Sequence, residues 1–309
     1  MVEVDVIGLG ASTVDILSLV DHLPSEDEVL RAEDISVQGG GPVATAMVTL
    51  GRLGARAGMI DTIGDDWRGA LIRDEFQREG VSVEYLKVGK GWTSSTSCIL
   101  VKKGSGARSI IWSPGSAPEL SPADLPRSAI ASAKILHVNG RHWAACMEAV
   151  RVAREAGAQV SFDGGAGRYR PELEELVPLT HICIVARDFA EKYTRVAEVD
   201  KAAEILLRAG PRVVVITGGT KGSWICSQDG QSFHQPAYLF PSVVDTTGCG
   251  DSYHGAFLFG LLNGMDLERT ASFASAVAAI NTQRLGGRIG LPTYEQVVSF
   301  LVGRAESLN

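Results

Sequence analysis

Residues 244–256 read VDTTGCGDSYHGA and lead into the apolar stretch AFLFGLL, which predicts the start of a helix. Gly248, Cys249 and Gly250 carry little or no side chain. Amide N–H groups at this helix N-terminus can therefore converge on an oxyanion, whose charge the helix dipole favours. Asp251 falls in the first turn, where a carboxylate can serve only to complement the dipole. Beside an anion site it can also accept a proton from an attacking hydroxyl, as phosphoryl transfer requires.

A second glycine-rich stretch, QGGGPVATAMVTLGRLGA at residues 38–55, precedes another predicted helix. Pro42 suits the first turn of that helix. The glycines before it let the backbone approach a ligand closely, although an ordinary tight turn between a strand and a helix explains them equally well.

The stretch GLGAST at residues 8–13 follows a predicted strand. It is not a dinucleotide-binding fingerprint, because Thr13 stands where the third glycine is needed and no helical pattern follows. The loop instead offers Asp15 to a ligand, since open α/β sheets bind ligands at the carboxyl ends of their strands. A surface carboxylate without a ligand is the alternative.

The elements that must position these residues follow an alternating pattern. Short apolar runs such as VEVDVIGL and ARAGMIDTIG alternate with helical patterns such as WRGALIRDEFQREG, and the alternation resumes after residue 130. This order predicts an α/β fold with a mostly parallel sheet and crossover helices. Near the C-terminus, SWICSQDGQSFHQP predicts a hairpin that turns at Asp229-Gly230, followed by two helices.

Two stretches interrupt this pattern, at residues 15–38 and 92–113. Both are extended and partly alternating in polarity, so we expect them to form the strands of a small lid outside the main sheet. Neither a low-complexity linker nor an internal repeat divides the chain, and residues 1–309 are expected to form a single domain.

Composition narrows the range of partners. The net charge is −7 and the pI about 5.4, which argues against nucleic-acid binding because that needs a basic face, and favours small-molecule ligands. Five widely spaced cysteines suggest neither a zinc site nor a disulfide framework, so a reducing cytoplasm fits best. Neither a signal peptide nor a membrane-spanning run is evident.

The motifs together resemble those of a known family. DTTGCGDSYHGAF resembles the C-terminal signature of the ribokinase-like (PfkB) carbohydrate kinases, and GGGPVATAMVTLGRLGA with IGDDWRG resembles their N-terminal signature, in the expected order. The resemblance covers essentially the whole chain. It implies a ribokinase-like three-layer sandwich with a small β-sheet lid, and ATP-dependent phosphorylation of a sugar hydroxyl with Mg²⁺.

The resemblance also assigns roles to matched positions. Asp251 would be the base that activates the sugar hydroxyl, and the backbone of Gly248, Cys249 and Gly250 would hold the γ-phosphoryl group. The other matched positions are Asp15, Gly40 and Gly41 for the sugar; Thr217, Gly219 and Gly222 in TGGTKGS for the nucleotide; and Asp245 and Thr247 for a monovalent cation, with K⁺ as the candidate ion.

Several positions depart from the family pattern. Ribokinases have a lysine and an asparagine where this chain has Pro42 and Thr45, which disfavours ribose as the substrate. The usual Asn-x-x-Glu motif appears as Ala186-Arg187-Asp188-Phe189, although Mg²⁺ is still expected because ATP carries it. Cys249 replaces the usual alanine of the anion site. It is expected to fill space, and a reactive thiol at the helix N-terminus is the alternative.

Within the family, GGGPVATA, HQPAY, DTTGCGDSYHGA and GGRIGLP are most similar to the sulfofructose kinase branch. Arg141 falls where that branch presents a basic group to its sugar. The branch's lid lysine, however, aligns with Val29, next to Asp27 and Glu28. A neutral ketose is therefore an equal candidate, with Arg141 holding a hydroxyl or a carboxylate.

The sequence thus indicates an ATP-dependent sugar kinase whose partners are a monosaccharide and ATP. A nucleoside kinase of the same fold and a sugar-sensing protein without catalysis are the alternatives. Relatives commonly dimerise through lid strands. His137, His142 and His254 are expected to be structural, and Asp66 and Trp67 to form a turn and a helix cap.

Overall fold

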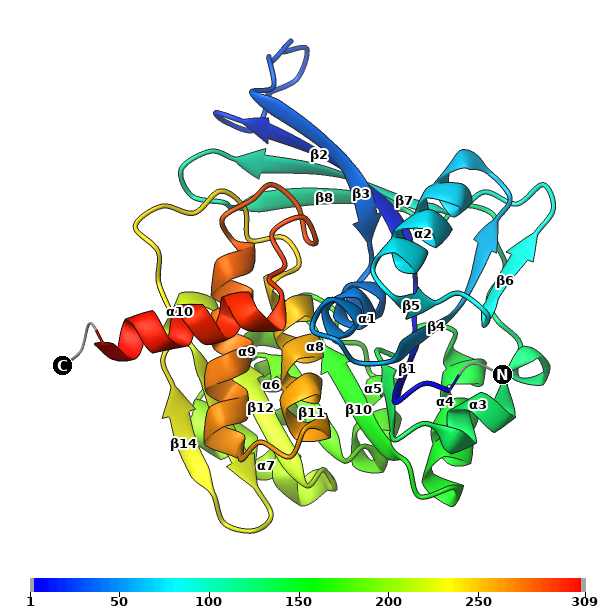
Figure 1. The fold of residues 1–309 in the computed structure, drawn as a ribbon, viewed down its shortest axis with the longest axis vertical. Helices are drawn as coiled ribbons and strands as arrows, with labels where there is room; N and C mark the ends of the chain where they lie inside the picture. The colour runs from blue at the N-terminus through cyan, green and yellow to red at the C-terminus, as the bar shows by residue number, and fades with distance from the viewer. Residues whose placement is uncertain (1–2, 307–309) are drawn as a thin grey trace.

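The computed structural model describes residues 3–306, which form two sheets with helices packed around the larger one (Figure 1). In this part of the chain the larger sheet has ten strands, in the order β14-β13-β12-β11-β10-β9-β1-β4-β5, and β6 also pairs with β4. Its pairings are parallel except at the edge formed by β13 and β14. The strands are β1 (Val6–Leu9), β4 (Ala57–Gly64), β5 (Val81–Ser82), β6 (Leu86–Gly89), β9 (Ile135–Val138), β10 (Gln159–Gly164), β11 (Ile182–Ala186), β12 (Val213–Thr217), β13 (Ser223–Ser227) and β14 (Ser232–Gln235).

Helices cover both faces of this sheet and make a three-layer sandwich, as the family resemblance implied. Strand side chains alternate between two cores: Ile184 of β11 packs with one group of helices and Val185 with the other. One group is α1 (Pro42–Arg52), α2 (Trp67–Arg78), α8 (Cys249–Leu262), α9 (Leu267–Asn281) and α10 (Tyr294–Glu306). The other is α3 (Arg127–Ser132), α4 (Trp143–Glu155), α5 (Leu173–Leu176), α6 (Arg187–Thr194) and α7 (Val199–Ala209).

Short 3₁₀ helices join some of these elements, and we label them η1 (Pro122–Asp124), η2 (Val177–Leu179) and η3 (Gly219–Lys221). Within residues 3–306, no helix has the length and apolar character that a bilayer crossing requires. Asp66 caps α2 by accepting a hydrogen bond from the amide of Gly69 at 3.0 Å, so the predicted helix cap is confirmed.

The C-terminal region differs in one respect from the prediction. The hairpin of β13 and β14 turns at Asp229-Gly230 as expected, but the described chain continues with three helices instead of two. Gly264, with φ of 70°, ends α8, and Asp266 immediately caps α9 by accepting from the amide of Arg269 at 2.8 Å. Asn263, Gly264 and Asp266 mark this break in the sequence, so the prediction of two helices was wrong by one.

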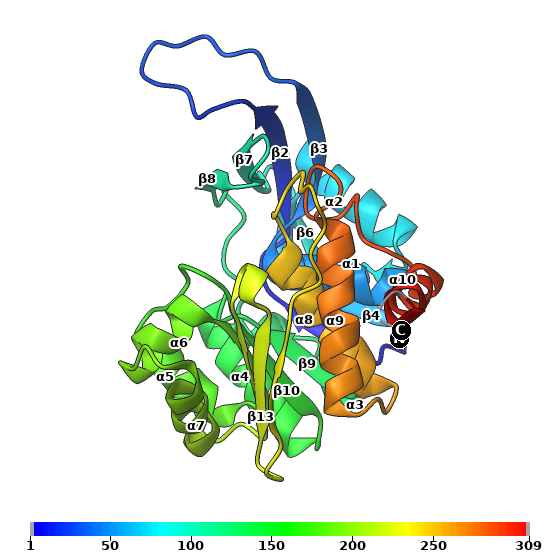
Figure 2. The ribbon, with the colours of Figure 1, turned by 90° about the vertical axis from the view of Figure 1, so that its left-hand side faces the viewer.

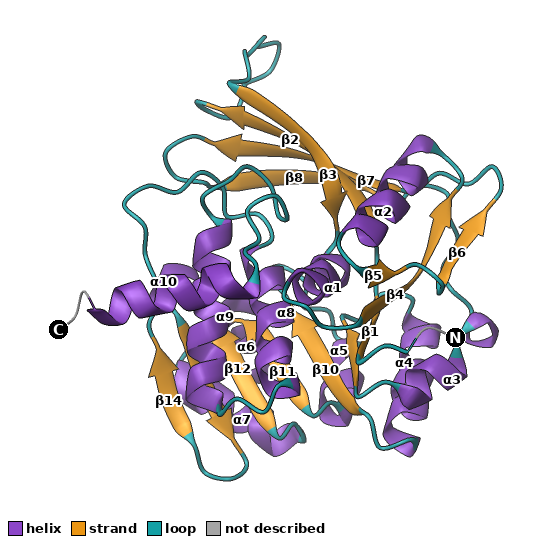
Figure 3. Cartoon of the chain, in the orientation of Figure 1, coloured by secondary structure: helices purple, strands orange, loops and turns teal. Residues whose placement is uncertain are grey.

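The stretches predicted to form a lid contribute a separate four-stranded sheet within the described chain, in the order β3-β2-β7-β8 (Figure 3). We call it the small sheet; its strands are β2 (Thr13–Val20), β3 (Asp34–Gly40), β7 (Ser95–Lys102) and β8 (Arg108–Ser113). A long loop between β2 and β3 extends beyond it (Figure 2). Its role as a lid, and dimerisation through it, remain predictions.

Close helix packing brings the two predicted glycine-rich turns to the same end of the main sheet. The glycine Gly255 of α8 lies against the carbonyl of Ala46 in α1, where a Cβ atom would have no room. The N-termini of α1 and α8 consequently lie together beneath the small sheet (Figure 1). This arrangement depends on the position of Gly255 between the two helices.

Candidate active site

A cavity of about 1240 Å³ lies between the carboxyl ends of the main-sheet strands and the small sheet. Single-ligand sites usually measure about 300–1,000 Å³, so this cavity has room for two substrates. The predicted site residues that line it are Asp15, Gly41, Arg141, Thr217, Gly219, Gly222, Thr247, Gly248, Cys249, Gly250 and Asp251. Gly40 packs behind Asp15, and Asp245 is buried behind the start of α8.

The start of α8 has the geometry of an anion site. Gly248 caps the helix with φ of 70°, a conformation that favours glycine. The amides of Gly250 and Asp251 have no acceptor among residues 3–306, as is usual in a first helical turn. A Cβ atom at Gly250 would meet nothing within 4 Å, so the turn is open to a ligand. We call Gly248, Cys249 and Gly250 the anion cradle.

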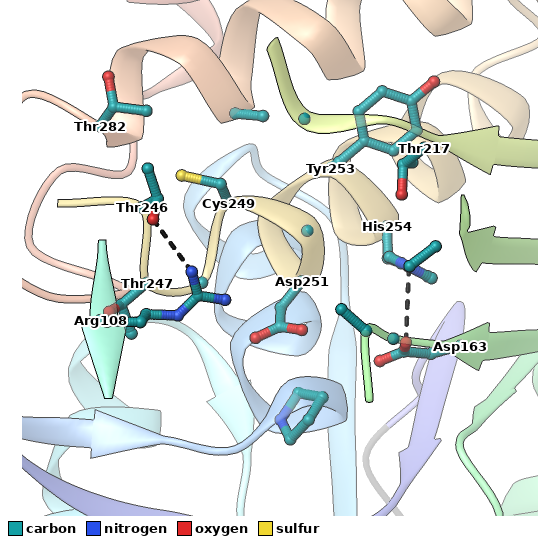
Figure 4. Close-up of a pocket in the computed structure, with 18 of the residues that line it drawn as sticks. Arg108, Asp163, Thr217, Thr246, Thr247, Cys249, Asp251, Tyr253, His254 and Thr282 are labelled. Carbon is teal, nitrogen blue, oxygen red and sulfur yellow. Dashed lines mark hydrogen bonds and ion pairs between the residues drawn. The ribbon is translucent and has the colours of Figure 1, made fainter. Parts of the chain in front are cut away.

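Asp251 faces the middle of the cavity (Figure 4). Burial raises the pKa of its carboxyl group above the ordinary value, and the nearby Asp163 carboxylate raises it further, while the positive charge of Arg168 acts in the opposite direction. A carboxylate with a raised pKa is a stronger base than a solvent-exposed aspartate. The site can therefore present a proton acceptor beside an anion cradle.

Hydrogen bonds hold the loop that precedes the cradle. The Asp245 carboxylate accepts from the amide and the hydroxyl of Thr247 and from the amide of Gly286, each at 2.8 Å. The Thr246 hydroxyl donates to the carbonyl of Gly106 at 2.7 Å and accepts from Arg108 at 3.0 Å. Because Gly106 lies in the turn between β7 and β8, these bonds join the cradle to the small sheet.

The Cys249 thiol does not have the low pKa that a reactive cysteine needs. Burial raises its pKa to about 12, and this outweighs the helix N-terminus and the positive charge of Arg108. The high pKa disfavours the alternative of a reactive thiol and favours Cys249 as a small residue in the cradle.

On the sugar side predicted from the sequence, Asp15 is buried at the start of β2. Its carboxylate accepts from the Thr13 hydroxyl at 2.8 Å, and burial raises its pKa. The backbone of Gly40 packs so closely against this carboxylate that a Cβ atom there would collide with it. The glycine turn thus fixes the position of Asp15 at the cavity wall.

Arg141 lies on the same wall, in the loop after β9. Its Nη1 atom pairs with Glu119 at 2.7 Å, and its amide donates to the side chain of Asn139 at 3.1 Å. The Nε atom is buried and has no hydrogen-bond partner within the described residues. This N–H group is therefore available to an acceptor atom of a ligand.

The predicted nucleotide side begins where β12 ends at Thr217. Gly219 and Gly222 of the following turn both have positive φ, of 60° and 87°, and a Cβ atom at Gly222 would collide with the carbonyl of Gln235. Other residues around this part of the cavity are Tyr238, Leu239, Ser275, Ala278, Ala279 and Thr282. This mixed apolar and polar wall suits a flat base with hydrogen-bonding edges.

The altered Asn-x-x-Glu motif retains one carboxylate at the cavity. Phe189 is fully buried in the core, but Asp188 lines the cavity and accepts a hydrogen bond from the amide of Gly167 at 2.7 Å. Mg²⁺ prefers oxygen ligands of this type, directly or through water. Asp188 is thus a candidate for the role of the missing glutamate.

The cavity also contains residues that the sequence did not single out as ligands, chiefly Arg108, Asp163 and Arg168. No local motif marks them, because Arg108 comes from β8, Asp163 from the end of β10 and Arg168 from the loop that follows β10. The expectation for the histidines holds clearly for His142, which is buried between the Asp61 carboxylate, at 2.8 Å, and the amide of Leu120, at 3.0 Å.

A proton acceptor beside an anion cradle, in a cavity with room for two ligands, is the arrangement that a phosphotransferase needs. The chain belongs to the pfkB family of carbohydrate kinases, whose profile matches residues 3–294. It is therefore a kinase, and the family resemblance seen in the sequence is confirmed.

Individual relatives extend over nearly the full chain. The chain is 28% identical to 5-dehydro-2-deoxygluconokinase of Shouchella clausii, over 96% of this chain and 94% of that protein. It is 30% identical to ribokinase of Mus musculus, over 93% of this chain and 91% of that protein. The structure of Arabidopsis thaliana ribokinase complexed with ribose and ATP has a TM-score of 0.83 at 23% identity, covering 97% and 99% of the two chains. The fold is thus ribokinase-like.

Proposed function

We propose that this kinase transfers the γ-phosphoryl group of ATP to a hydroxyl of a monosaccharide. The observation that carries this proposal is the position of Asp251, which faces a single cavity beside the open anion cradle. Asp15 and Arg141 line the same cavity, as does the glycine turn after Thr217. The two regions supply separate places for an acceptor and a nucleotide.

In the proposed reaction, the Asp251 carboxylate takes the proton of the acceptor hydroxyl. The hydroxyl oxygen forms a bond to the γ-phosphorus as the bond between that phosphorus and the bridging oxygen of ADP breaks, and ADP leaves with the electron pair. The open amides at the start of α8 hold the oxygens of the transferring group, since charge builds up there in the transition state. Arg108, which reaches Thr246 from β8, adds a positive charge nearby.

Bound Mg²⁺ would neutralise phosphate charge on ATP. Asp188 provides a carboxylate for it or for its waters. The residues Thr217, Gly219 and Gly222 are proposed to hold the nucleotide, because the close turn exposes backbone groups at the end of β12. Closing the small sheet over both substrates would exclude water that competes for the phosphoryl group.

The acceptor is proposed to be a ketose or a related sugar with at most one carboxylate. Arg141 offers a buried, unpartnered Nε–H group, but Glu119 already offsets much of its charge. Val29, at the position of the sulfofructose kinase lid lysine, is fully exposed in the loop after β2. Without the lid lysine, these features support a neutral sugar, or one whose carboxylate pairs with Arg141, over a sulfonated sugar.

The test is release of ADP from ATP and Mg²⁺ across a panel of ketoses, aldoses, sugar acids, sulfofructose and nucleosides. We expect the highest kcat/KM with a ketose or sugar acid. A clear preference for sulfofructose would overturn the argument from Arg141 and Val29, and a preference for a nucleoside would favour the nucleoside kinase alternative. Sugar binding without any ADP release would identify a sensor in place of an enzyme.

A further inference from the structure

Three ionisable side chains meet beneath the wall of the cavity. His137 of β9, Asp163 of β10 and His254 of α8 have exposed fractions of 0%, 2% and 3%. One ligand atom from each lies within 4.8 Å of the others. The strands are adjacent in the sheet, and α8 places His254 one helical turn after Asp251. We call these residues the buried triad.

Several polar side-chain atoms of the buried triad have no hydrogen-bond partner within the described residues. Both oxygens of Asp163, Nε2 of His137 and Nδ1 of His254 are buried without a partner among residues 3–306. The approaches of His254 Nε2 at 3.6 Å and of Arg168 Nη1 at 3.8 Å are longer than a hydrogen bond. Buried polar groups are nearly always paired, and an unpaired buried carboxylate is especially costly.

No hydrogen bond from either imidazole compensates for the buried Asp163 carboxylate. The Nδ1 atom of His137 lies 3.1 Å from the Ser161 hydroxyl, which fixes the ring while Nε2 points away unpaired. Neutral imidazole nitrogens are good metal ligands.

We propose that His137, Asp163 and His254 bind one divalent transition-metal ion of the zinc type. Two imidazoles and one carboxylate, with further positions open to water, form a common donor set for such ions. Bonds of about 2.1 Å put neighbouring ligand atoms of a tetrahedral site roughly 3.4 Å apart. The 3.6 Å from Asp163 to His254 Nε2 is close to this value, and binding would draw the most distant pair together by at most about 1.4 Å.

A metal ion can reach the buried triad from the cavity. Asp163 and His254 both line the cavity, and their facing side chains are visible from it (Figure 4). The nitrogen ligands distinguish this site from one for Mg²⁺, which prefers oxygen and keeps several waters. The inference does not rest on the proposed sugar phosphorylation, because it follows from the unpaired atoms and from the spacing of the three side chains.

The test begins with the full-length protein after treatment with a chelator. We expect Co²⁺ to bind at one ion per chain with visible d–d absorption, Zn²⁺ to displace it, and excess Mg²⁺ to leave the spectrum unchanged. In Asp163→Asn and His254→Gln, metal affinity should fall by more than the roughly 10- to 100-fold typical of losing a group that supports a metal ligand. The matched control is His234→Gln, which removes a histidine on the edge strand β14, outside the triad.

Circular dichroism and thermal melting must show that the variants fold. Two separate substitutions are used so that the test still works if one variant does not fold. Zn²⁺ should raise the Tm of the wild type but not that of either triad variant. Failure of the wild type to bind stoichiometric Co²⁺ would overturn the proposal and leave water as the partner of these groups. Retained binding in both triad variants, or a thiolate charge-transfer band that places Co²⁺ on a cysteine, would also overturn it.

Discussion

The starts of α1 and α8 are two helix N-termini capped by a glycine of positive φ, and their chemistry differs. Gly41 caps α1 with φ of 92°, and Gly248 caps α8 with φ of 70°. Both face the same cavity. Only α8 has a carboxylate in its first turn, Asp251, whereas the first turn of α1 has Pro42 and no acidic residue.

The two sites need glycine for different reasons. At α1 they are surrounded by protein, since a Cβ atom on Gly40 would collide with Asp15 and one on Gly41 with the carbonyl of Ala11. At α8, a Cβ atom on Gly248 would collide with the backbone of Gly287, but a Cβ atom on Gly250 would have nothing within 4 Å of it. The α1 turn fixes the side chain of Asp15 at the cavity wall, whereas the α8 turn leaves open space at Gly250.

A buried ion pair, Arg288–Glu75, lies behind the α1 turn. Among residues 3–306, no such pair lies behind the α8 turn. Arg288 donates to the carbonyl of Gly40 at 2.7 Å and to Glu75 at 3.1 Å, and Glu75 in turn accepts from the amide of Gly39 at 2.6 Å. Arg288 also donates to the Thr45 hydroxyl at 3.1 Å. This network makes the α1 turn a rigid support, while the α8 turn is held mainly through Asp245.

The largest expected effect comes from removing the carboxylate of Asp251, which the α8 turn has and the α1 turn lacks. Asp251→Asn keeps the shape of the α8 turn and removes the base, so kcat should fall by about 10²- to 10⁴-fold. This corresponds to about 3–5 kcal/mol, compared with about 0.3–1 kcal/mol for a carboxylate that only complements a helix dipole. Steady-state kinetics with the best sugar provide the measurement. A variant with most of its kcat would make Asp251 a helix cap.

The pH dependence of kcat gives a second test of Asp251 as the base. Because burial raises the pKa of Asp251, protonation should disable the base at a higher pH than for an ordinary aspartate. The kcat of the wild type should therefore fall as the pH is lowered through this raised pKa and reach a plateau above it. The acidic limb should be absent from the residual activity of Asp251→Asn, and its persistence would assign the limb to another group.

Breaking the support behind α1 should affect stability first. Arg288→Met leaves Glu75 buried without its partner, so the free energy of unfolding should fall by about 3–5 kcal/mol. Urea denaturation measures the change, and Arg284→Met, at an exposed arginine of the same loop, is the matched control. Replacing both members of the pair by apolar residues should recover much of the loss. Equal stability of the two arginine variants would contradict the proposed support.

Adding one methyl group tests whether the α8 turn is open for a ligand. Gly250→Ala should keep or raise the stability by about 0.5–1 kcal/mol, since alanine favours a helix. It should also lower kcat/KM by up to about 10²-fold by displacing the phosphoryl group. Gly41→Ala is the contrasting variant, which should lose stability because of its positive φ. Full activity in Gly250→Ala would place the phosphoryl group elsewhere.

The KM for the sugar should depend on Asp15, the side chain that the α1 turn supports. Asp15→Ala should raise the KM for the sugar by about 10- to 100-fold, as expected for the loss of a hydrogen bond to a charged group, with little change in the KM for ATP. Asp21→Ala, just after β2 and exposed, is the control. A larger effect on ATP than on the sugar would show that the sugar has been assigned to the wrong side.

The smallest expected effect concerns the loop behind the cradle. We propose that Asp245 and Thr247 contribute to a monovalent cation site, so activity should rise a few-fold when K⁺ replaces Na⁺ at constant ionic strength. The Asp245 carboxylate already accepts three hydrogen bonds, which limits the expected gain. Identical rates in the two salts would leave Asp245 with only its role in holding the loop.

The sequence alone identified the elements whose properties are local. The period of apolar residues predicted the parallel sheet and its helices, and small residues before a helical pattern predicted the turns at Gly41 and Gly248. The position of Asp251 in a first helical turn also follows from a few neighbouring residues. Local backbone conformation depends on local residue types, which is why these predictions could be made.

Only the tertiary structure decided which distant residues meet. Arg288 lies far along the chain from Gly40, and the buried triad combines two strands with a helix; no spacing in the sequence marks either group. The high pKa of Cys249 likewise arises from burial, which opposes what its position at a helix N-terminus suggests. Contacts and burial depend on how the whole chain packs, so the charges and spare hydrogen-bonding groups at the site could be assigned only after folding.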